Sequence, residues 1–116
     1  MNETKILSTT YISEHHYFRA REDSYQTPTG KIVDPYFLVE IPRSVVAMAI
    51  TENNEVVMVE QYRHPIQKNL MELPGGFIDG NEKIEDALKR ELLEETGYEF
   101  SNVFFLGVTA GNPGVL

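Results

Sequence analysis

Cysteine and tryptophan are both absent from this chain of 116 residues, and basic residues are few. Without cysteine the protein has no disulfide, no thiolate zinc site and no cysteine nucleophile. The 10 lysines and arginines stand against 18 aspartates and glutamates, which gives a formal net charge of −8. Because an acidic surface repels a polyanion, we expect no nucleic-acid partner, whereas divalent cations are attracted.

Long hydrophobic runs are lacking as well. No apolar stretch approaches the roughly 18 residues of a membrane helix. The first ten residues, MNETKILSTT, have no apolar core of the kind found in signal peptides. We therefore expect no membrane association and a cytoplasmic location. The length corresponds to one small domain, and 41% hydrophobic residues with 24% charged ones are typical of a globular protein.

The first part of the chain, residues 4–62, is predicted to be rich in β-structure. Residues 11–21 mix aromatic and charged side chains in a strand-like way, and residues 31–40 form another predicted strand. Pro28 and Gly30 indicate a turn between these two segments.

Pro42 marks a soft boundary, and an uninterrupted apolar run follows it at residues 44–50. Such a run is typical of a strand that is covered on both faces. With a turn at residues 52–55 and a second strand at residues 56–62, it predicts a hairpin. Residues 63–81 contain several prolines and glycines and are expected to be mostly loop.

One helix is predicted at about residues 82–96. Gly97 would end it as a left-handed cap, and Asn81 or Asp79 would cap its start. After the helix, the apolar residues 103–108 predict one more strand.

The apolar face of this helix contains carboxylates. The face is defined by Ile84, Ala87, Leu88 and Leu92. At about 100° per residue, Glu91 and Glu95 fall about 20° from its centre, and Glu94 lies on its flank. Buried carboxylates that repel one another are stabilised by a hard divalent cation such as Mg2+ or Mn2+. The alternative is that Glu91 or Glu95 pairs with Arg90, Lys89 or a distant arginine.

A glycine-rich loop, residues 73–80, precedes the helix. Gly75 and Gly76 permit close backbone approach and positive φ angles. Backbone groups of such a loop can coordinate a metal or meet a phosphate, although two glycines alone would also suit a plain turn.

Loop and helix together carry a spaced motif. Gly76, Glu82 and the run RELLEETGY at residues 90–98 fit the pattern G-x5-E-x7-R-E-U-x-E-E-x-G-U, in which U is a large hydrophobic residue. This pattern resembles the Nudix box, with Tyr98 at a last position where isoleucine, leucine or valine is usual. The resemblance implies an α/β fold, an α/β/α sandwich around a mixed sheet, and hydrolysis of a nucleoside diphosphate linked to another moiety.

The resemblance also implies residue roles. The implied ligands of Mg2+, or of Mn2+, are Glu91, Glu94, Glu95 and the backbone carbonyl of Gly75. Arg90 would hold a glutamate of the motif in place by a charge-assisted pair and belongs, with Glu94 and Glu95, to the expected catalytic set. Glu82 would be an outer metal-binding or orienting carboxylate, and Gly76 and Glu82 are both expected at the substrate.

The flanks of the motif resemble ADP-ribose pyrophosphatases and related nucleotide-sugar hydrolases. The resemblance rests on residues 59–65, VEQYRHP, on residues 72–76, ELPGG, and on Pro113, which stands fifteen residues after Tyr98. In that subgroup the arginine matching Arg63 approaches the phosphates of the substrate. The alternative is a surface arginine, paired with Glu60 or Glu72.

Members of that subgroup carry an N-terminal antiparallel β-sheet that is used for dimerisation. The resemblance therefore implies two parts, an N-terminal β-sheet for dimerisation and substrate contacts at residues 1–42 and a Nudix core at residues 43–116. It also implies a homodimer.

The fold of that family continues past the proline into further strands and a closing helix. In the subgroup, a glutamate of that later part is the catalytic base. We therefore expect this sequence to be a fragment or an unusual short form, and we assign no general base. Glu82 and Glu94 are the nearest remaining carboxylates.

The leading functional hypothesis is Mg2+-dependent hydrolysis of the pyrophosphate bond of ADP-ribose or a related nucleoside diphosphate sugar. The products would be a nucleoside monophosphate and a sugar phosphate. One alternative is a housecleaning hydrolase of modified nucleoside triphosphates. Another is a nucleotide-binding module that does not cleave its ligand.

Overall fold

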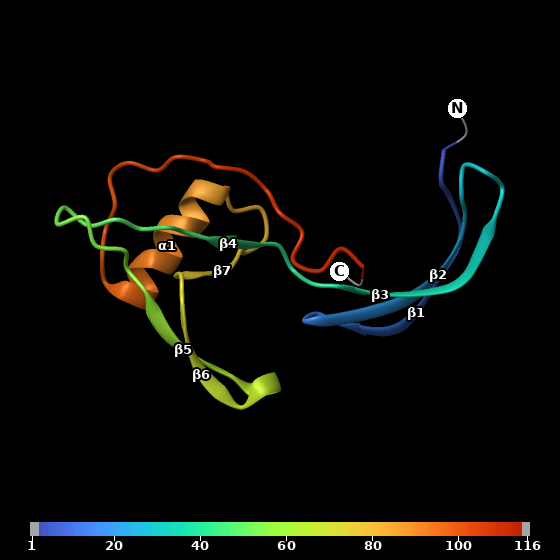
Figure 1. Cartoon of the computed structure of the whole chain (residues 1–116), viewed down its shortest axis with the longest axis horizontal. Coiled ribbons are helices and arrows are strands. Elements are labelled where there is room, and N and C mark those ends of the chain that lie inside the picture. Colours follow the sequence, from blue (N-terminus) through green and yellow to red (C-terminus); the bar gives the residue numbers. More distant parts are fainter. Residues whose placement is uncertain (1–2, 115–116) are drawn as a thin grey trace. The chain divides into compact units, whose positions relative to one another are not determined.

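The computed structural model describes residues 3–114, and the chain forms two compact units. The first unit extends to Pro42 and also includes the segment from Gly107 onwards. The second unit is Arg43–Leu106. Figure 1 shows the elements of both units in sequence colours.

The first unit contains a three-stranded antiparallel sheet in the order β1-β2-β3 (Figure 1). Its strands are β1 (Lys5–His15), β2 (Phe18–Gln26) and β3 (Ile32–Glu40). The strand-like reading of residues 11–21 is wrong in one respect, because the chain reverses at His16 and Tyr17. The backbone N–H of Tyr17 donates to Nδ1 of His15 at 3.2 Å, and this local bond favours a turn over a continuous strand.

One face of this sheet carries an ionic cluster centred on Arg21. The guanidinium of Arg21 donates to Glu40, and its Nη2 donates to Oδ2 of Asp23 at 3.2 Å. Oδ1 of Asp23 accepts from the hydroxyl of Thr9 at 2.8 Å, and the hydroxyl of Tyr11 donates to Glu40 at 2.9 Å. The strand register accounts for this meeting, because Thr9 pairs with Asp23 and Tyr11 with Arg21 across β1 and β2.

The segment from Gly107 onwards is held to this sheet by Tyr36 of β3. The hydroxyl of Tyr36 donates to the backbone carbonyl of Gly114. The ring of Tyr36 also packs edge-on against Tyr25 of β2, with ring centroids 5.8 Å apart. This pair fixes the direction of the Tyr36 hydroxyl.

The second unit consists of two strand pairs, a short 3-10 turn and one α-helix. The elements are β4 (Ser44–Val46), β5 (Val59–Arg63), the 3-10 turn His64–Ile66, β6 (Lys68–Glu72), β7 (Gly75–Phe77) and α1 (Ile84–Thr96). Strand β4 pairs with β7, and β5 pairs with β6, both antiparallel. Within residues 3–114 all strand pairs are antiparallel and α1 is the single α-helix, so the expected mixed sheet between helical layers is not seen there.

The predicted hairpin of residues 44–62 is only partly correct. Ile50 does bridge to Val56, and the backbone N–H of Val57 donates to the carbonyl of Ala49 at 2.9 Å. The outer parts of the two segments pair elsewhere, with β7 and β6. Residues 63–81 are therefore not mostly loop, because both of these strands lie within them.

The segment that begins with β4 has one buried face. Its buried side chains are Val45, Ala47 and Ala49, which are 9%, 8% and 5% exposed. Its exposed side chains are Val46, Met48 and Ile50, at 64%, 61% and 53%. The expectation of a strand covered on both faces is thus not met within the described residues. Ala47 and Ala49 form a core with Leu92 of α1, against which Val57, Leu88 and Phe100 pack.

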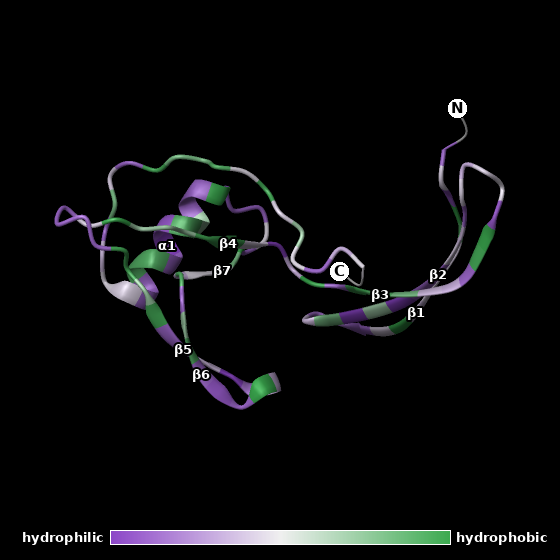
Figure 2. Cartoon of the chain, viewed as in Figure 1, coloured by the Kyte–Doolittle hydropathy of each residue, from purple (hydrophilic) through white to green (hydrophobic). Residues whose placement is uncertain are grey.

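Helix α1 begins at Ile84, later than predicted. Its N-cap residue is Lys83, which makes no side-chain cap bond, so neither Asn81 nor Asp79 caps the helix. The backbone N–H of Glu82 instead donates to the carbonyl of Asp79 at 2.9 Å in a separate turn. The helix ends as predicted, at Gly97 with a φ of 75°. Figure 2 shows hydrophilic and hydrophobic residues alternating along α1, as expected for a helix with one buried side.

The predicted strand at residues 103–108 is absent. The structure shows an irregular extended segment there, and Phe104 and Leu106 are 81% and 89% exposed. No strand of residues 3–114 pairs with this segment, and a strand without a partner leaves its backbone groups unbonded. None of the helices in the described part of the chain has the length and apolar character required to cross a membrane.

Candidate active site

Arg90 connects α1 with the loop that precedes it. Its Nε and Nη2 donate to the two carboxylate oxygens of Glu82, each at 2.9 Å. Its Nη1 donates to Oε1 of Glu91 at 2.8 Å, and Nη2 also donates to the backbone carbonyl of Phe77 at 3.1 Å. Two further carboxylates lie at 3.4 and 3.5 Å, those of Asp79 and Glu94. The planar fork of five N–H donors in arginine makes such a multiple contact possible.

These contacts change the protonation behaviour of both partners. The hydrogen bonds to Glu82 and then to Glu91 raise the pKa of Arg90 well above its ordinary value. The hydrogen bond from Arg90 lowers the pKa of Glu82, and the backbone N–H of Asp79 lowers it further. Glu82 is therefore ionised at neutral pH and fully engaged by its partners.

Glu91 lies against Gly76 of β7. Its side chain is 14% exposed, which agrees with its expected place on the buried face of the helix. A Cβ at position 76 would lie 2.4 Å from both Cδ and Oε2 of Glu91, so a larger residue there would displace the carboxylate from this position. Gly75 and Gly76 sit in an extended strand and not in a loop, and neither has a positive φ angle. Close approach is the reason for glycine at both positions.

Glu95 reaches the start of the same strand. Its Oε2 accepts the backbone N–H of Gly75 at 3.1 Å, although the residue is exposed and not central to a buried face. At Gly75 a Cβ would lie 2.1 Å from the carbonyl oxygen of Val45, so the pairing of β4 with β7 needs glycine as well. Glu91 and Glu95 thus adjoin two successive residues of β7.

The expected metal ligands already have partners in the structure or lie apart from one another. Glu91 pairs with Arg90, and Glu95 bonds to a backbone N–H, whereas Glu94 is 60% exposed with one contact at 3.5 Å. Within residues 3–114, no three aspartate, glutamate or histidine side chains are close enough together to hold a metal ion. The donor chemistry does fit Mg2+ or Mn2+, since Glu91, Glu94, Glu95 and the carbonyl of Gly75 are all hard oxygen donors.

Arg63 stands at the end of β5 and is paired with Glu72 of β6. Its Nε donates to both carboxylate oxygens of Glu72, at 3.0 and 2.9 Å, and its Nη2 lies 2.8 Å from Oε2. This is one of the two partners considered for a surface arginine, and the Arg63 side chain is 52% exposed. The hydrogen bonds to Glu72 raise the pKa of Arg63, and the charge of Glu95 adds to that rise.

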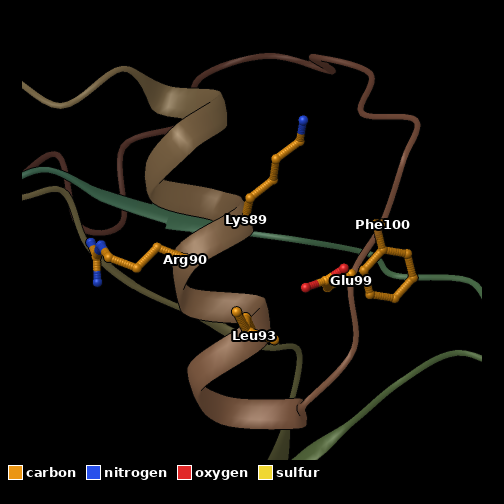
Figure 3. A pocket seen from close by; sticks show the side chains of 5 residues that line it. All are labelled: Lys89, Arg90, Leu93, Glu99 and Phe100. Atoms are coloured by element: carbon orange, nitrogen blue, oxygen red, sulfur yellow. The ribbon is translucent and has the colours of Figure 1, made fainter.

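A shallow pocket lies beside α1, where the loop after the helix passes it. It is lined by Lys89, Arg90, Leu93, Glu99 and Phe100 (Figure 3). Figure 3 shows Arg90 and Lys89 extending to opposite sides of the helix, with Glu99 and Phe100 on the neighbouring loop. The three helix glutamates expected to bind metal do not line this pocket, so it is separate from them.

Sequence reasoning did not find all partners of Arg90. The position of Asp79 in the sequence predicts a helix cap and not a partner of Arg90, and a backbone carbonyl such as that of Phe77 leaves no mark in a sequence. The sequence shows that Asp79 precedes Arg90 by eleven residues. Whether the two side chains meet depends on the path of the loop, which the sequence does not specify.

Two segments of the chain match known protein families. Residues 40–114 match the NUDIX domain, and residues 4–39 match the nucleoside diphosphate sugar hydrolase N-terminal domain. The chain belongs to the NUDIX family. Its residues 76–98 are therefore a Nudix box. All the residues that Arg90 contacts lie within the box, with Phe77 and Asp79 at its variable positions.

Several curated proteins are similar to this NUDIX chain. A methanol dehydrogenase activator from Bacillus methanolicus is 36% identical over 112 residues, 97% of this chain and 60% of the relative. An ADP-ribose pyrophosphatase from Bacillus subtilis (strain 168) is 29% identical over 112 residues, with the same coverages. The chain thus spans about 60% of the length of these two relatives.

A solved structure shows the same fold. The crystal structure of an ADP compounds hydrolase superposes with a TM-score of 0.83 at 19% sequence identity. The match covers 99% of this chain and 62% of the solved chain. The arrangement of antiparallel strands and one helix is therefore Nudix-like.

Proposed function

We propose that the protein is a pyrophosphohydrolase that cleaves ADP-ribose or a related nucleoside diphosphate sugar with Mg2+. The products are a nucleoside monophosphate and a sugar phosphate. The observation that carries this proposal is the meeting of Glu91 and Glu95 with the Gly75–Gly76 backbone, where Arg90 fixes Glu91. The family match of residues 4–39 and the ADP-ribose pyrophosphatase relative support this substrate class.

Divalent metals are generally used by hydrolases of this family. Glu91, Glu94, Glu95 and the carbonyl of Gly75 would hold Mg2+ or Mn2+. The ion would neutralise the diphosphate and lower the pKa of a bound water. Arg90 keeps Glu91 oriented, and Glu82 in turn keeps Arg90 oriented.

Proton transfer at the attacking water needs a carboxylate that is not fully engaged. Glu82 has a lowered pKa and bonds to Arg90 through both oxygens, so it is a poor proton acceptor. Glu94 is exposed and makes one contact at 3.5 Å, so one of its oxygens could hold the ion while the other accepts a proton. Among the carboxylates of the box, Glu94 therefore suits this role best.

Substrate contacts would come from Arg63, from the backbone at Gly76 and from the vicinity of Glu82. Residues 1–42 would supply a dimerisation surface and further substrate contacts, and residues 43–116 the Nudix core. These proposals predict a homodimer in the cytoplasm.

A panel of nucleotide diphosphates assayed with Mg2+, with identification of the products, tests the substrate class. We expect ADP-ribose-type compounds to be cleaved to a monophosphate and a sugar phosphate faster than any nucleoside triphosphate. A panel in which nucleoside triphosphates are hydrolysed faster than every nucleotide sugar would favour the housecleaning alternative.

A second candidate function comes from the relative that is named as a methanol dehydrogenase activator. That protein is 36% identical over 97% of this chain, compared with 29% for the ADP-ribose pyrophosphatase over the same share. Alcohol dehydrogenase assays with and without the protein test this candidate. Repeating them with Glu95→Gln shows whether any stimulation depends on hydrolysis.

A further inference from the structure

The ion pair of Arg63 and Glu72 spans the length of a hairpin. Strands β5 and β6 are antiparallel, and Arg63 is directly opposite Lys68, whereas Glu72 is opposite Val59 at the other end. Figure 1 shows this hairpin reaching away from α1, with the 3-10 turn at its far end. The backbone of Arg63 adjoins that turn, so its side chain must lie back along the hairpin to meet Glu72.

The strand register places Glu72 on the same face of the hairpin as Arg63. Side chains alternate between the two faces of a strand, so Arg63, Gln61 and Val59 share one face of β5. Glu60 lies on the opposite face, where its Oε1 accepts from Nδ2 of Asn69 at 3.3 Å. Lys68, the residue directly opposite Arg63, has the same charge and favours a position of Arg63 away from the turn.

The Glu72 end of the hairpin adjoins the carboxylates of the box. Pro74 follows shortly and is fully buried, and the next residue, Gly75, donates its N–H to Glu95. An arginine drawn to Glu72 is therefore drawn toward the backbone that meets Glu91 and Glu95. An arginine without this partner would extend from the turn into solvent.

We propose that Glu72 is a positioning residue, which holds the guanidinium of Arg63 at the start of β7 so that its outer edge meets the diphosphate. The inference rests on the proposed function. Nε of Arg63 donates to Glu72, Nη2 lies 2.8 Å from Oε2 of Glu72, and in the described part of the chain Nη1 of Arg63 has no partner. Arg63 thus offers the substrate its Nη edge, while Glu72 fixes the direction of that edge.

Replacing Glu72 by alanine tests the proposal, because the two possible roles of Glu72 predict opposite changes in substrate binding. If Glu72 contributed only negative charge, its removal would tighten the binding of an anionic substrate. Positioning predicts the opposite, a rise in the KM for ADP-ribose of about tenfold with little change in kcat, as for loss of an orienting partner. Glu72→Gln keeps the size and one hydrogen bond, so we expect a smaller rise. Tighter binding in Glu72→Ala would overturn the proposal.

Two further variants complete the kinetic test. Glu60→Gln removes the same charge from the same hairpin but from the other face, and we expect it to leave the KM unchanged. In the double variant Arg63→Ala with Glu72→Ala, the loss should equal that of Arg63→Ala alone, because Glu72 acts through Arg63. Additive losses would contradict the proposed route.

An NMR measurement tests the positioning without any assay of activity. The Nε–H resonance of Arg63, assigned by its loss in Arg63→Lys, should be resolved in the wild type and in Glu60→Gln. It should shift and exchange rapidly with water in Glu72→Gln and Glu72→Ala. An unchanged resonance in these variants overturns the proposal whatever the substrate. If the resonance behaves as expected but no nucleotide diphosphate is cleaved, the proposed function fails and the positioning of Arg63 stands.

Discussion

Arg21 in the β1–β3 sheet and Arg90 in α1 each gather carboxylates, but the two clusters differ in charge balance. Around Arg21 stand Asp23 and Glu40, and Arg19 adds a second positive charge at 3.6 Å from Glu40. Two cations thus face two anions. Arg90 alone faces four carboxylates within 3.5 Å, those of Asp79, Glu82, Glu91 and Glu94.

In the balanced cluster the two carboxylates are paired with cations, although the buried Nε of Arg21 has no hydrogen-bond partner within residues 3–114. Asp23 has a side chain only 7% exposed, and each of its oxygens has a hydrogen-bond partner. The cluster around Arg90 has a surplus of negative charge, and Glu95 adds to it on the same helix. A surplus of carboxylates in one place is stabilised by a cation from outside. The comparison therefore separates a cluster that joins strands from one whose surplus of negative charge is consistent with the proposed metal site.

The largest effect is expected when one negative charge is removed from the carboxylates near Arg90. In Glu95→Gln we expect activity to fall about a hundredfold or more, the size typical of a catalytic group. We also expect Mg2+ affinity to fall by at least about tenfold. Calorimetric titration with Mg2+ measures the affinity, and Glu40→Gln in the balanced cluster is the matched control. Unchanged affinity and rate in both Glu91→Gln and Glu95→Gln would mean that the two clusters have the same, structural role.

The next effect comes from filling the space beside Glu91. In Gly76→Ala the new methyl group would overlap the Glu91 carboxylate, which must then move away from β7. We expect a loss of about tenfold to a hundredfold in Mg2+ affinity, as for other disturbances of ligand orientation. Gly80→Asn is the control, because position 80 has a φ of 51° and no atom within 4 Å of a Cβ. Equal losses in both variants would point to general disturbance of the loop.

In the balanced cluster the expected effect is on stability. Arg21→Met leaves Asp23 without its cation and leaves Glu40 with Arg19 alone, and we expect a loss of about 2 kcal/mol in the free energy of unfolding, below the value for a fully buried pair because Arg21 is 22% exposed. Mg2+ affinity should not change. Urea unfolding with calorimetry measures both quantities. A large loss of Mg2+ affinity in this variant would remove the distinction between the clusters.

The smallest expected effect is a loss of fold stability at acid pH. The hydrogen bond from Arg90 lowers the folded-state pKa of Glu82 below its ordinary value of 4.5. The pair therefore stabilises the fold fully at pH values above 4.5, and this contribution is lost as the pH falls through the lower, folded-state pKa. Wild type should exceed Glu82→Gln in stability at neutral pH, and the two should converge in acid. An NMR titration that placed the Glu82 midpoint above 4.5 would contradict this assignment.

The local elements of the fold were predictable where periodicity or capping signals are strong. The helix and its end at Gly97 followed from the spacing of apolar residues and the glycine. Strand β7 was missed because Gly75 and Gly76 are typical of turns, and here they serve as strand residues that allow close approach to Val45 and Glu91. Residues 103–108 have strand composition, but pairing depends on a neighbour that composition does not specify.

The candidate site was predictable to the extent that the motif placed Glu91, Glu95 and Gly75 in one region. The sequence left open whether Glu91 binds a metal or pairs with Arg90, and the structure shows the pairing with Arg90. The partners Phe77 and Asp79 could not be predicted, because a backbone carbonyl and a loop aspartate meet Arg90 only through the path of the loop.

The exposed stripe of Val46, Met48 and Ile50 predicts that the stability of the protein depends on its concentration. Burial of apolar surface against any partner is favourable, and binding to the native state alone shifts the folding equilibrium by mass action. Thermal midpoints of this chain should therefore rise with its concentration, in parallel with the mass seen by light scattering. Replacing Met48 by lysine should weaken both trends, since a charge in the middle of the stripe resists burial.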